Sequence, residues 1–213
     1  LRANTVVANW IEGRPWIMSS KGEQQFSRNL RSAFRLGCNL LVLDSDAQEW
    51  EALGKVPAKD RVVDVLWRAN KTGELMLLLA YIVTRSSDWR GAKLRVLVEP
   101  EGGEGEAQTV ERLEALLDDF RIEAEVVVFD GKGEAQGVEL MARARESSLV
   151  FLPFSTHSGR FYGPFGGELA ELLRPLPIVV LTLAAQDVDL AADPDIEDES
   201  NESEPGKAPK DGA

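Results

Sequence analysis

Residues 63–98 constrain this chain most, because they contain three consecutive segments that are stable only inside a packed α/β core. Segment 62–67 is apolar and leads into a turn at 70–73, where Asn, Lys, Thr and Gly occur together. Segment 75–83 is apolar on every face, which predicts a helix buried all round. Segment 94–98 has the β-branched pattern of a short strand. Together they predict a βαβ unit with a parallel strand pair.

The rest of the chain continues this alternation of strands and helices. Further strands are predicted at 5–11, 40–43, 125–129, 149–154 and 178–183, and helices at 20–37, 47–53, 110–120, 135–145 and 168–173. Unbroken apolar strands indicate a sheet that is covered on both faces. We therefore predict an α/β fold of three layers, in which about seven mostly parallel strands are flanked by helices.

Two aspartates, Asp44 and Asp46, follow the strand predicted at 40–43. Carboxylates at the end of a strand suit either a divalent cation or the N-cap of the next helix. We favour the cap. With one cysteine, Cys38, and one histidine, His157, the sequence also offers no thiolate or imidazole cluster, so we expect no metal site.

Five segments of the first 130 residues carry a family resemblance: 63–67, Gly73, 75–82, 89–90 and 93–96, with supporting matches at 4–7, Trp10 and 120–122. They resemble the cytosolic C-terminal domain of cation-chloride cotransporters, symporters of the amino acid-polyamine-organocation superfamily that move chloride with sodium or potassium. Leu66, Glu74 and Ala80 depart from the family's usual residues, which favours a prokaryotic member. The resemblance implies a fold, a homodimer and a parent transporter, and no catalytic residue.

Charge is distributed unevenly along the chain. There are 36 acidic and 24 basic residues, a formal net charge of −12. Residues 187–213 hold ten of the acids and only two lysines, which leaves about −4 for residues 1–186. The acidic segment has almost no apolar residues, so we predict a domain at 1–186 and a disordered, dispensable tail at 187–213. A mildly acidic domain argues against a nucleic-acid partner, which needs a basic face.

The sequence shows no apolar window near eighteen residues and no signal peptide, and its single cysteine suits a reducing compartment. It starts at Leu1 rather than Met. We expect a piece of a longer chain whose transmembrane part lies upstream and whose cytoplasmic side carries this domain. Arg28, Arg31 and Arg35 form a basic stripe on the helix at 20–37 that suits anionic lipid, although a solvated face is the preferred interpretation.

A glycine-rich segment at 155–167 lies between a predicted strand and a predicted helix. This arrangement is similar to the closing third of universal stress proteins, some of which bind ATP at this turn. Backbone N–H groups at such a turn suit phosphate. The candidate residues for ATP or ADP are Ser155, Gly159, Arg160, Gly163, Gly166 and Gly167. A universal-stress-protein-like nucleotide sensor is therefore the alternative function, and the default expectation is no cofactor.

Catalysis is disfavoured, because His157 is the only histidine and no nucleophile elbow is present. We expect Trp10 and Trp67 in the core, whereas Trp16, Trp50 and Trp89 lie beside predicted loops and suit an interface. The sequence as a whole favours a cytosolic regulatory and dimerisation domain of a cation-chloride cotransporter, with its own transmembrane domain as partner.

Overall fold

The computed structural model describes residues 4–10, 20–100, 105–129, 142–157, 160–165 and 169–185. Its strands are β1 (Thr5–Asn9), β2 (Asn39–Asp44), β3 (Val62–Leu66), β4 (Lys93–Val98), β5 (Glu125–Val128), β6 (Leu149–Pro153), β7 (Ser155–His157), β8 (Arg160–Tyr162) and β9 (Val179–Leu183). Its helices are α2 (Ser20–Arg35), α3 (Ala47–Gly54), α4 (Lys71–Arg85), α5 (Glu106–Asp119) and α7 (Leu169–Leu173), with 3-10 turns η1 (Ala58–Asp60) and η2 (Ser87–Trp89). The predicted tail and most of the helix predicted at 135–145 lie outside these ranges.

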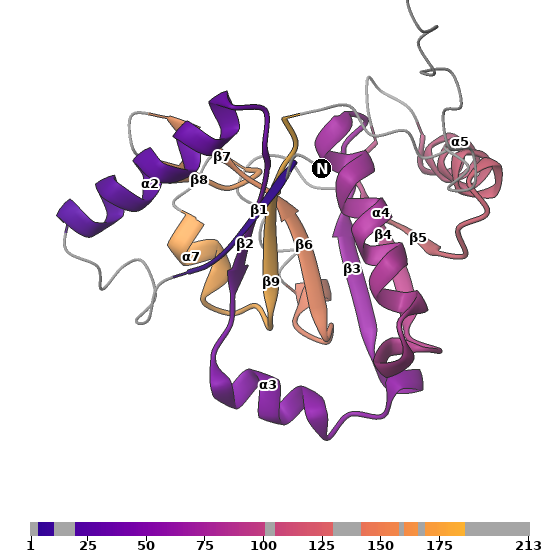
Figure 1. The fold of residues 1–213 in the computed structure, drawn as a ribbon. Helices are drawn as coiled ribbons and strands as arrows, with labels where there is room; N and C mark the ends of the chain where they lie inside the picture. The colour runs from indigo at the N-terminus through magenta and orange to yellow at the C-terminus, as the bar shows by residue number, and fades with distance from the viewer. Residues whose placement is uncertain are drawn as a thin grey trace, which may run out of the picture.

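Seven strands form one sheet in the order β1-β2-β9-β6-β3-β4-β5 (Figure 1). The five strands from β9 to β5 are parallel to one another. Strands β1 and β2 are parallel to each other, but β2 pairs with β9 in the antiparallel direction. The prediction of a mostly parallel seven-stranded sheet is therefore confirmed, and the sheet contains one antiparallel seam.

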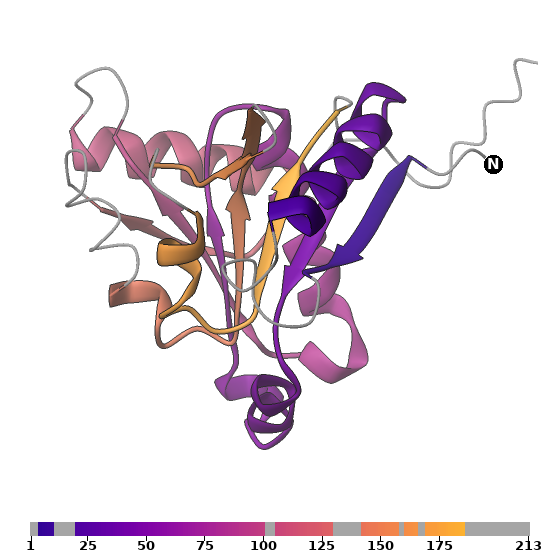
Figure 2. The same cartoon turned by 90° about the vertical axis from the view of Figure 1, so that its left-hand side faces the viewer.

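Helices cover both faces of this sheet, as the two views in Figures 1 and 2 show. On one face, Leu30 of α2 and Leu173 of α7 join a buried cluster with residues of β2, β6 and β9. On the other face, Met76 of α4 and Leu113 of α5 join a second cluster with β3 and β4. The three layers follow from strands whose side chains are apolar in both directions, so that each face needs a cover.

The central unit is β3, α4 and β4, with β3 and β4 parallel and in register from Val62↔Lys93 to Leu66↔Leu97. This confirms the predicted βαβ unit. The helix begins earlier than expected: Asn70 is its N-cap, and its side chain accepts hydrogen bonds from Thr72 N and Gly73 N. The predicted turn at 70–73 is therefore mostly the first turn of α4, because an Asn before Lys-Thr-Gly is itself a helix start signal.

Burial of α4 also differs from the expectation. Leu75, Met76, Leu77 and Ala80 are buried, but Ile82 is 55% exposed. The prediction of a helix buried all round is wrong, because one face of α4 packs on the sheet and no described layer covers its outer face. Across the described ranges, none of the helices combines the length and the apolar character needed to cross a membrane.

Local signals elsewhere are confirmed. Asp46 caps α3: its carboxylate accepts from Gln48 N and Glu49 N, while Glu49 bonds back to Asp46 N at 2.8 Å. The favoured cap interpretation therefore holds. Beyond α2, Gly37 has φ of 82°, the left-handed conformation that a helix end commonly requires.

Candidate functional site

Strands β3 and β6 are neighbours whose chains leave in opposite directions at their carboxyl ends. From β3 the chain enters α4 on one face of the sheet, and from β6 it continues through β7 and β8 to α7 on the other face. Ligands of parallel α/β sheets bind preferentially where neighbouring connections diverge in this way. The carboxyl ends of β3 and β6 are therefore the first candidate for a ligand site.

On the β3 side, the start of α4 is closed by intramolecular bonds. Thr72 Oγ1 accepts from Ala184 N at 3.2 Å, and Lys71 Nζ donates to Ala185 O at 3.1 Å, so the segment after β9 is tied to α4. Gly73 packs directly on the loop: a Cβ there would lie 2.0 Å from Arg68 O. Asn70 already accepts hydrogen bonds from two of the first amides of α4. This helix end is therefore used for contacts within the domain.

On the β6 side, the glycine-rich segment contains a β-hairpin that sequence reasoning missed. The pairs are Ser155↔Tyr162, Thr156↔Phe161 and His157↔Arg160. The signal was present, because only Ser158 and Gly159 separate two short runs, a spacing typical of a two-residue hairpin loop.

The hairpin is anchored by an aromatic cluster. The Phe161 ring lies 5.1 Å from that of Trp10, 5.9 Å from that of Phe26 and 6.0 Å from that of Phe154, measured between centroids. These rings come from β8, from residues flanking β1 and β6, and from α2. Edge-to-face and tilted pairs of this kind add to the stability that burial provides. The hairpin is thus a packed part of the outer layer over β1 and β6.

The predicted nucleotide residues are only partly brought together. Ser155 is exposed at the start of β7, Arg160 begins β8, and Gly163 lies against α7, where an added Cβ would be 3.0 Å from Leu172 Cδ2. Gly159, Gly166 and Gly167 lie outside the described residues. Within the hairpin, backbone groups pair between β7 and β8. ATP or ADP binding at this turn stays a prediction.

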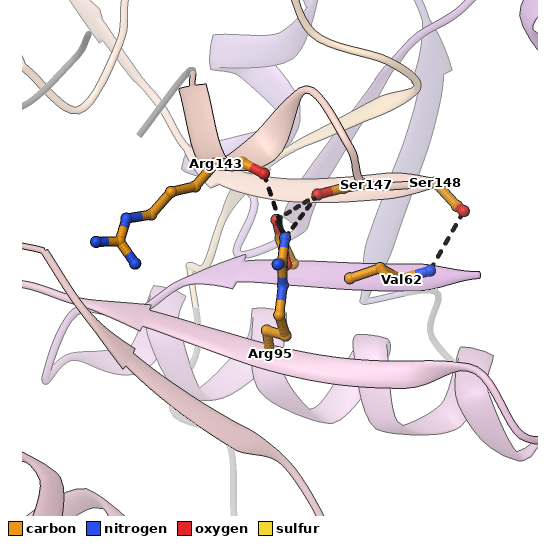
Figure 3. A network of polar contacts seen from close by, with 6 residues as sticks. Val62, Arg95, Arg143, Ser147 and Ser148 are labelled. Carbon is orange, nitrogen blue, oxygen red and sulfur yellow. Dashed lines mark hydrogen bonds and ion pairs between the residues drawn. The ribbon is translucent and has the colours of Figure 1, made fainter. Parts of the chain in front are cut away.

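A buried ion pair links two neighbouring strands of the sheet, β3 and β4 (Figure 3). Asp64 of β3 and Arg95 of β4 are register partners, and the Asp64 side chain is 0% exposed. Arg95 Nε and Nη2 each donate to one carboxylate oxygen of Asp64 at 2.8 Å. Arg95 Nη2 also lies 3.3 Å from Arg143 O and 3.2 Å from Ser147 Oγ, and Ser147 Oγ donates to Asp64.

This network joins the consecutive strands β3 and β4 to the segment that leads into β6. Ser147 precedes β6, and next to it Ser148 N donates to Val62 O at 2.7 Å. The hydrogen bonds to Asp64 raise the pKa of Arg95, and this effect outweighs the lowering caused by burial. Arg95 therefore stays charged at every physiological pH and acts as a fixed link between the two strands. The sequence signal was one acid and one base at the centres of consecutive apolar strands.

A groove of about 1130 Å³ lies at the amino ends of β4 and β5, between the carboxyl-terminal ends of α4 and α5. Its charged lining residues are Arg85, Lys93, Glu114, Asp118, Arg121, Glu123 and Glu125. Three cations face four anions, so the groove has no dominant sign to select a charged ligand. Among the residues that the structure describes, no cluster of three or more His, Cys, Asp or Glu could hold a metal ion.

The tryptophans divide as predicted where the structure describes them. Trp10 and Trp67 are buried, at 8% and 4% exposure. Trp50 on α3 is 44% exposed and donates from Nε1 to Ser45 Oγ at 2.9 Å. Trp89 is half-buried beneath the Arg61 guanidinium, 5.2 Å from the ring centroid. Trp16 lies outside the described residues, and the interface role of the loop-side tryptophans stays a prediction.

Comparisons with known proteins agree with the resemblance seen in the sequence. Residues 45–141 match the family model of solute carrier family 12. Over 80 residues, 38% of this chain, the sequence is 36% identical to solute carrier family 12 member 3 of Pseudopleuronectes americanus, and it spans about 8% of that relative's length. The resemblance to cation-chloride cotransporters is thereby confirmed.

A solved structure has the same fold. The crystal structure of the cytoplasmic domain of a prokaryotic cation chloride cotransporter matches with a TM-score of 0.55 and 14% sequence identity, over 86% of this chain and 65% of that one. The segment that matches the family model includes α3, β3, α4, β4, α5 and β5. It therefore contains both partners of the buried Asp64–Arg95 pair.

Proposed function

Since residues 45–141 relate this chain to solute carrier family 12, we propose that it is the cytosolic C-terminal regulatory and dimerisation domain of a cation-chloride cotransporter. The parent protein would carry chloride with sodium or potassium, and its transmembrane part would lie upstream of Leu1. That transmembrane part is the first partner of the domain. The domain itself would lie on the cytoplasmic side of the cell membrane.

The match over 45–141 is the observation that carries this proposal, because it falls on the central βαβ unit of the fold. The described residues contain no cluster that could hold a metal ion, and the groove at the amino ends of β4 and β5 has mixed charge. A three-layer body with exposed apolar residues, such as Val7 and Trp50, suits a domain that works by contact.

The transport part of the proposal is tested in the full-length parent protein. Proteoliposomes with the intact protein should show cation uptake that depends on external chloride, and removal of residues 1–186 should change its rate. Removal of only 187–213 is the matched control, because the composition of this segment gives it no core to contribute. Uptake that is absent, or equal with and without chloride, would overturn the cotransporter assignment.

The regulatory part has its own readout. If the domain regulates transport, deleting residues 1–186 changes uptake while the amount of protein in the membrane, measured on the same vesicles, stays constant. Unchanged uptake per molecule would refute regulation and leave transport intact. This separation matters because a destabilised transporter also loses flux through lower abundance.

A further inference from the structure

Strand β1 ends the sheet, and no described strand pairs with its outer side (Figure 2). Trp10 N donates to Leu43 O at 2.8 Å, and Asn4 O accepts from Asn39 N at 2.7 Å, so the even-numbered residues point their backbone groups toward β2. Backbone direction alternates along a strand. Thr5, Val7 and Asn9 therefore direct their N–H and C=O groups away from the sheet.

Within the described residues 4–10, β1 itself carries none of the sequence features that usually protect a terminal strand. Exposed edges commonly carry a lysine, a proline, an inward charge or a bulge. Residues 4–10 contain no charged residue and no proline, although 28% of the whole chain is charged. The pairing of β1 with β2 is continuous from Thr5↔Asn39 to Asn9↔Leu43, without a bulge. At the other end of the sheet, β5 begins with Glu125, and Arg121 and Glu123 precede it.

The exposed apolar residue of β1 lies at its centre. Val7 is 68% exposed, whereas Trp10, just beyond the strand, is buried in the aromatic cluster. A β-branched side chain in a central, solvent-facing position is suited to contact with another strand. Removing it from water on association would be favourable.

The outward groups are also self-complementary. Two copies of β1 in antiparallel orientation about a twofold axis at Val7 place Thr5 opposite Asn9 of the second copy and Val7 opposite itself. All three pairs are then of the hydrogen-bonded type, which gives about six backbone hydrogen bonds. Neither copy brings a charge to the contact. A twofold contact in which one patch meets itself is the commonest form of dimer interface.

We propose that β1 is a dimerisation edge, and that its occupant is β1 of a second copy of this chain, so that two sheets join into one. This rests on the proposed function, since it assigns a surface to the dimerisation role. Pairing of two five-residue strands buries less surface than a standard interface of about 1,600 Å². The isolated domain should therefore associate weakly. In the parent transporter, attachment to the membrane would raise the effective concentration of the two copies.

The test is sedimentation of the 213-residue chain at rising concentration, in about 0.5 M salt to screen its net charge of −12. Val7→Pro removes only an outward N–H and is compatible with an edge strand, so folding should persist. It should raise the dimer dissociation constant at least about tenfold, because both central hydrogen bonds are lost. Val7→Lys, which adds the charge typical of protected edges, should do the same. Ile82→Lys is the control, because Ile82 is an exposed apolar residue on α4, and it should leave the constant unchanged.

A covalent readout fixes the register. In antiparallel hydrogen-bonded pairs the Cα atoms lie about 5.5 Å apart, within the range that a disulfide spans. In a Cys38→Ser background, Val7→Cys should therefore give a disulfide-linked dimer on mild oxidation with dissolved oxygen as electron acceptor, and Ile82→Cys should not. A dimer that both Val7 variants leave intact would overturn the β1 edge and keep the dimerisation role. A chain that stays monomeric up to about millimolar would overturn both.

Discussion

Replacing Arg95 by methionine should destabilise the domain more than any surface change, because it leaves the Asp64 carboxylate buried without its cation. Asp64 is 0% exposed, and Arg95 supplies two hydrogen bonds of 2.8 Å to it. Loss of one member of a buried pair costs about 3–5 kcal/mol. The Arg95 side chain is itself 20% exposed, so water can reach part of the site and the lower end, about 3 kcal/mol, is expected.

The assay is urea unfolding followed by circular dichroism, with a thermal scan beside it. A loss of about 3 kcal/mol corresponds to a fall of about 6–12 °C in the midpoint for a domain of this size. Arg95→Lys keeps the charge but loses the bidentate geometry, so its stability should lie between that of the unchanged protein and that of Arg95→Met. Replacing both partners, Asp64→Leu with Arg95→Met, should recover most of the loss, since an apolar pair needs no solvation.

Two controls make the result decisive. Lys55→Met breaks the Lys55–Glu51 pair, whose side chains are 73% and 72% exposed, and should change stability by no more than about 0.5 kcal/mol. Because Asp64 raises the pKa of Arg95, the stabilisation is present below the unfolded-state pKa and is lost only as pH rises through the higher folded-state pKa. The cost of Arg95→Met should therefore be equal at pH 7 and pH 10. A cost below about 1 kcal/mol would refute the view of the pair as a buried link.

Three further variants test separate parts of the fold. Gly73→Ala should prevent stable folding or lower the thermal midpoint by more than about 10 °C, because its Cβ would lie 2.0 Å from Arg68 O; an unchanged midpoint would contradict that packing. Asp46→Ala removes the cap of α3 and should cost about 1 kcal/mol in urea unfolding, with Asp46→Asn as the conservative control. Truncation after residue 186 should leave the thermal midpoint unchanged within error, and a drop of several degrees would mean that the acidic segment packs on the domain.

Most of the sheet could be predicted from the sequence because its strands are short apolar runs bounded by turn residues. The cap at Asp46 was also readable, since Asp and Glu three positions apart satisfy each other's backbone groups. The start of α4 was misplaced because the Asn-Lys-Thr-Gly segment suits both a turn and a helix N-terminus, and only the tertiary bonds to 184–185 decide between them. Exposure of Ile82 depends on which layers surround α4, which periodicity does not encode.

The functional features divide in the same way. The hairpin of β7 and β8 has a local sequence signal, the two-residue loop between two short runs. The glycines of the same segment also suit phosphate binding, and the sequence was interpreted in that way. The Asp64–Arg95 pair is a non-local feature: its two residues are adjacent only because β3 and β4 pair in register. The open edge of β1 depends on strand order, and strand order results from the whole topology. Contacts of this kind follow from the assembled sheet and not from any window of sequence.

The position of β9 has a consequence for synthesis. Among the described strands it is the last in the sequence, yet it lies inside the sheet, between β2 and β6. Until residues 179–183 leave the ribosome, the strands from β1 to β2 and those from β6 to β5 are two pieces, each with an unpaired inner edge. Such edges attract other strands, and pairings this distant in sequence form slowly. The two inner edges should therefore stay open to incorrect pairing until β9 joins the two pieces.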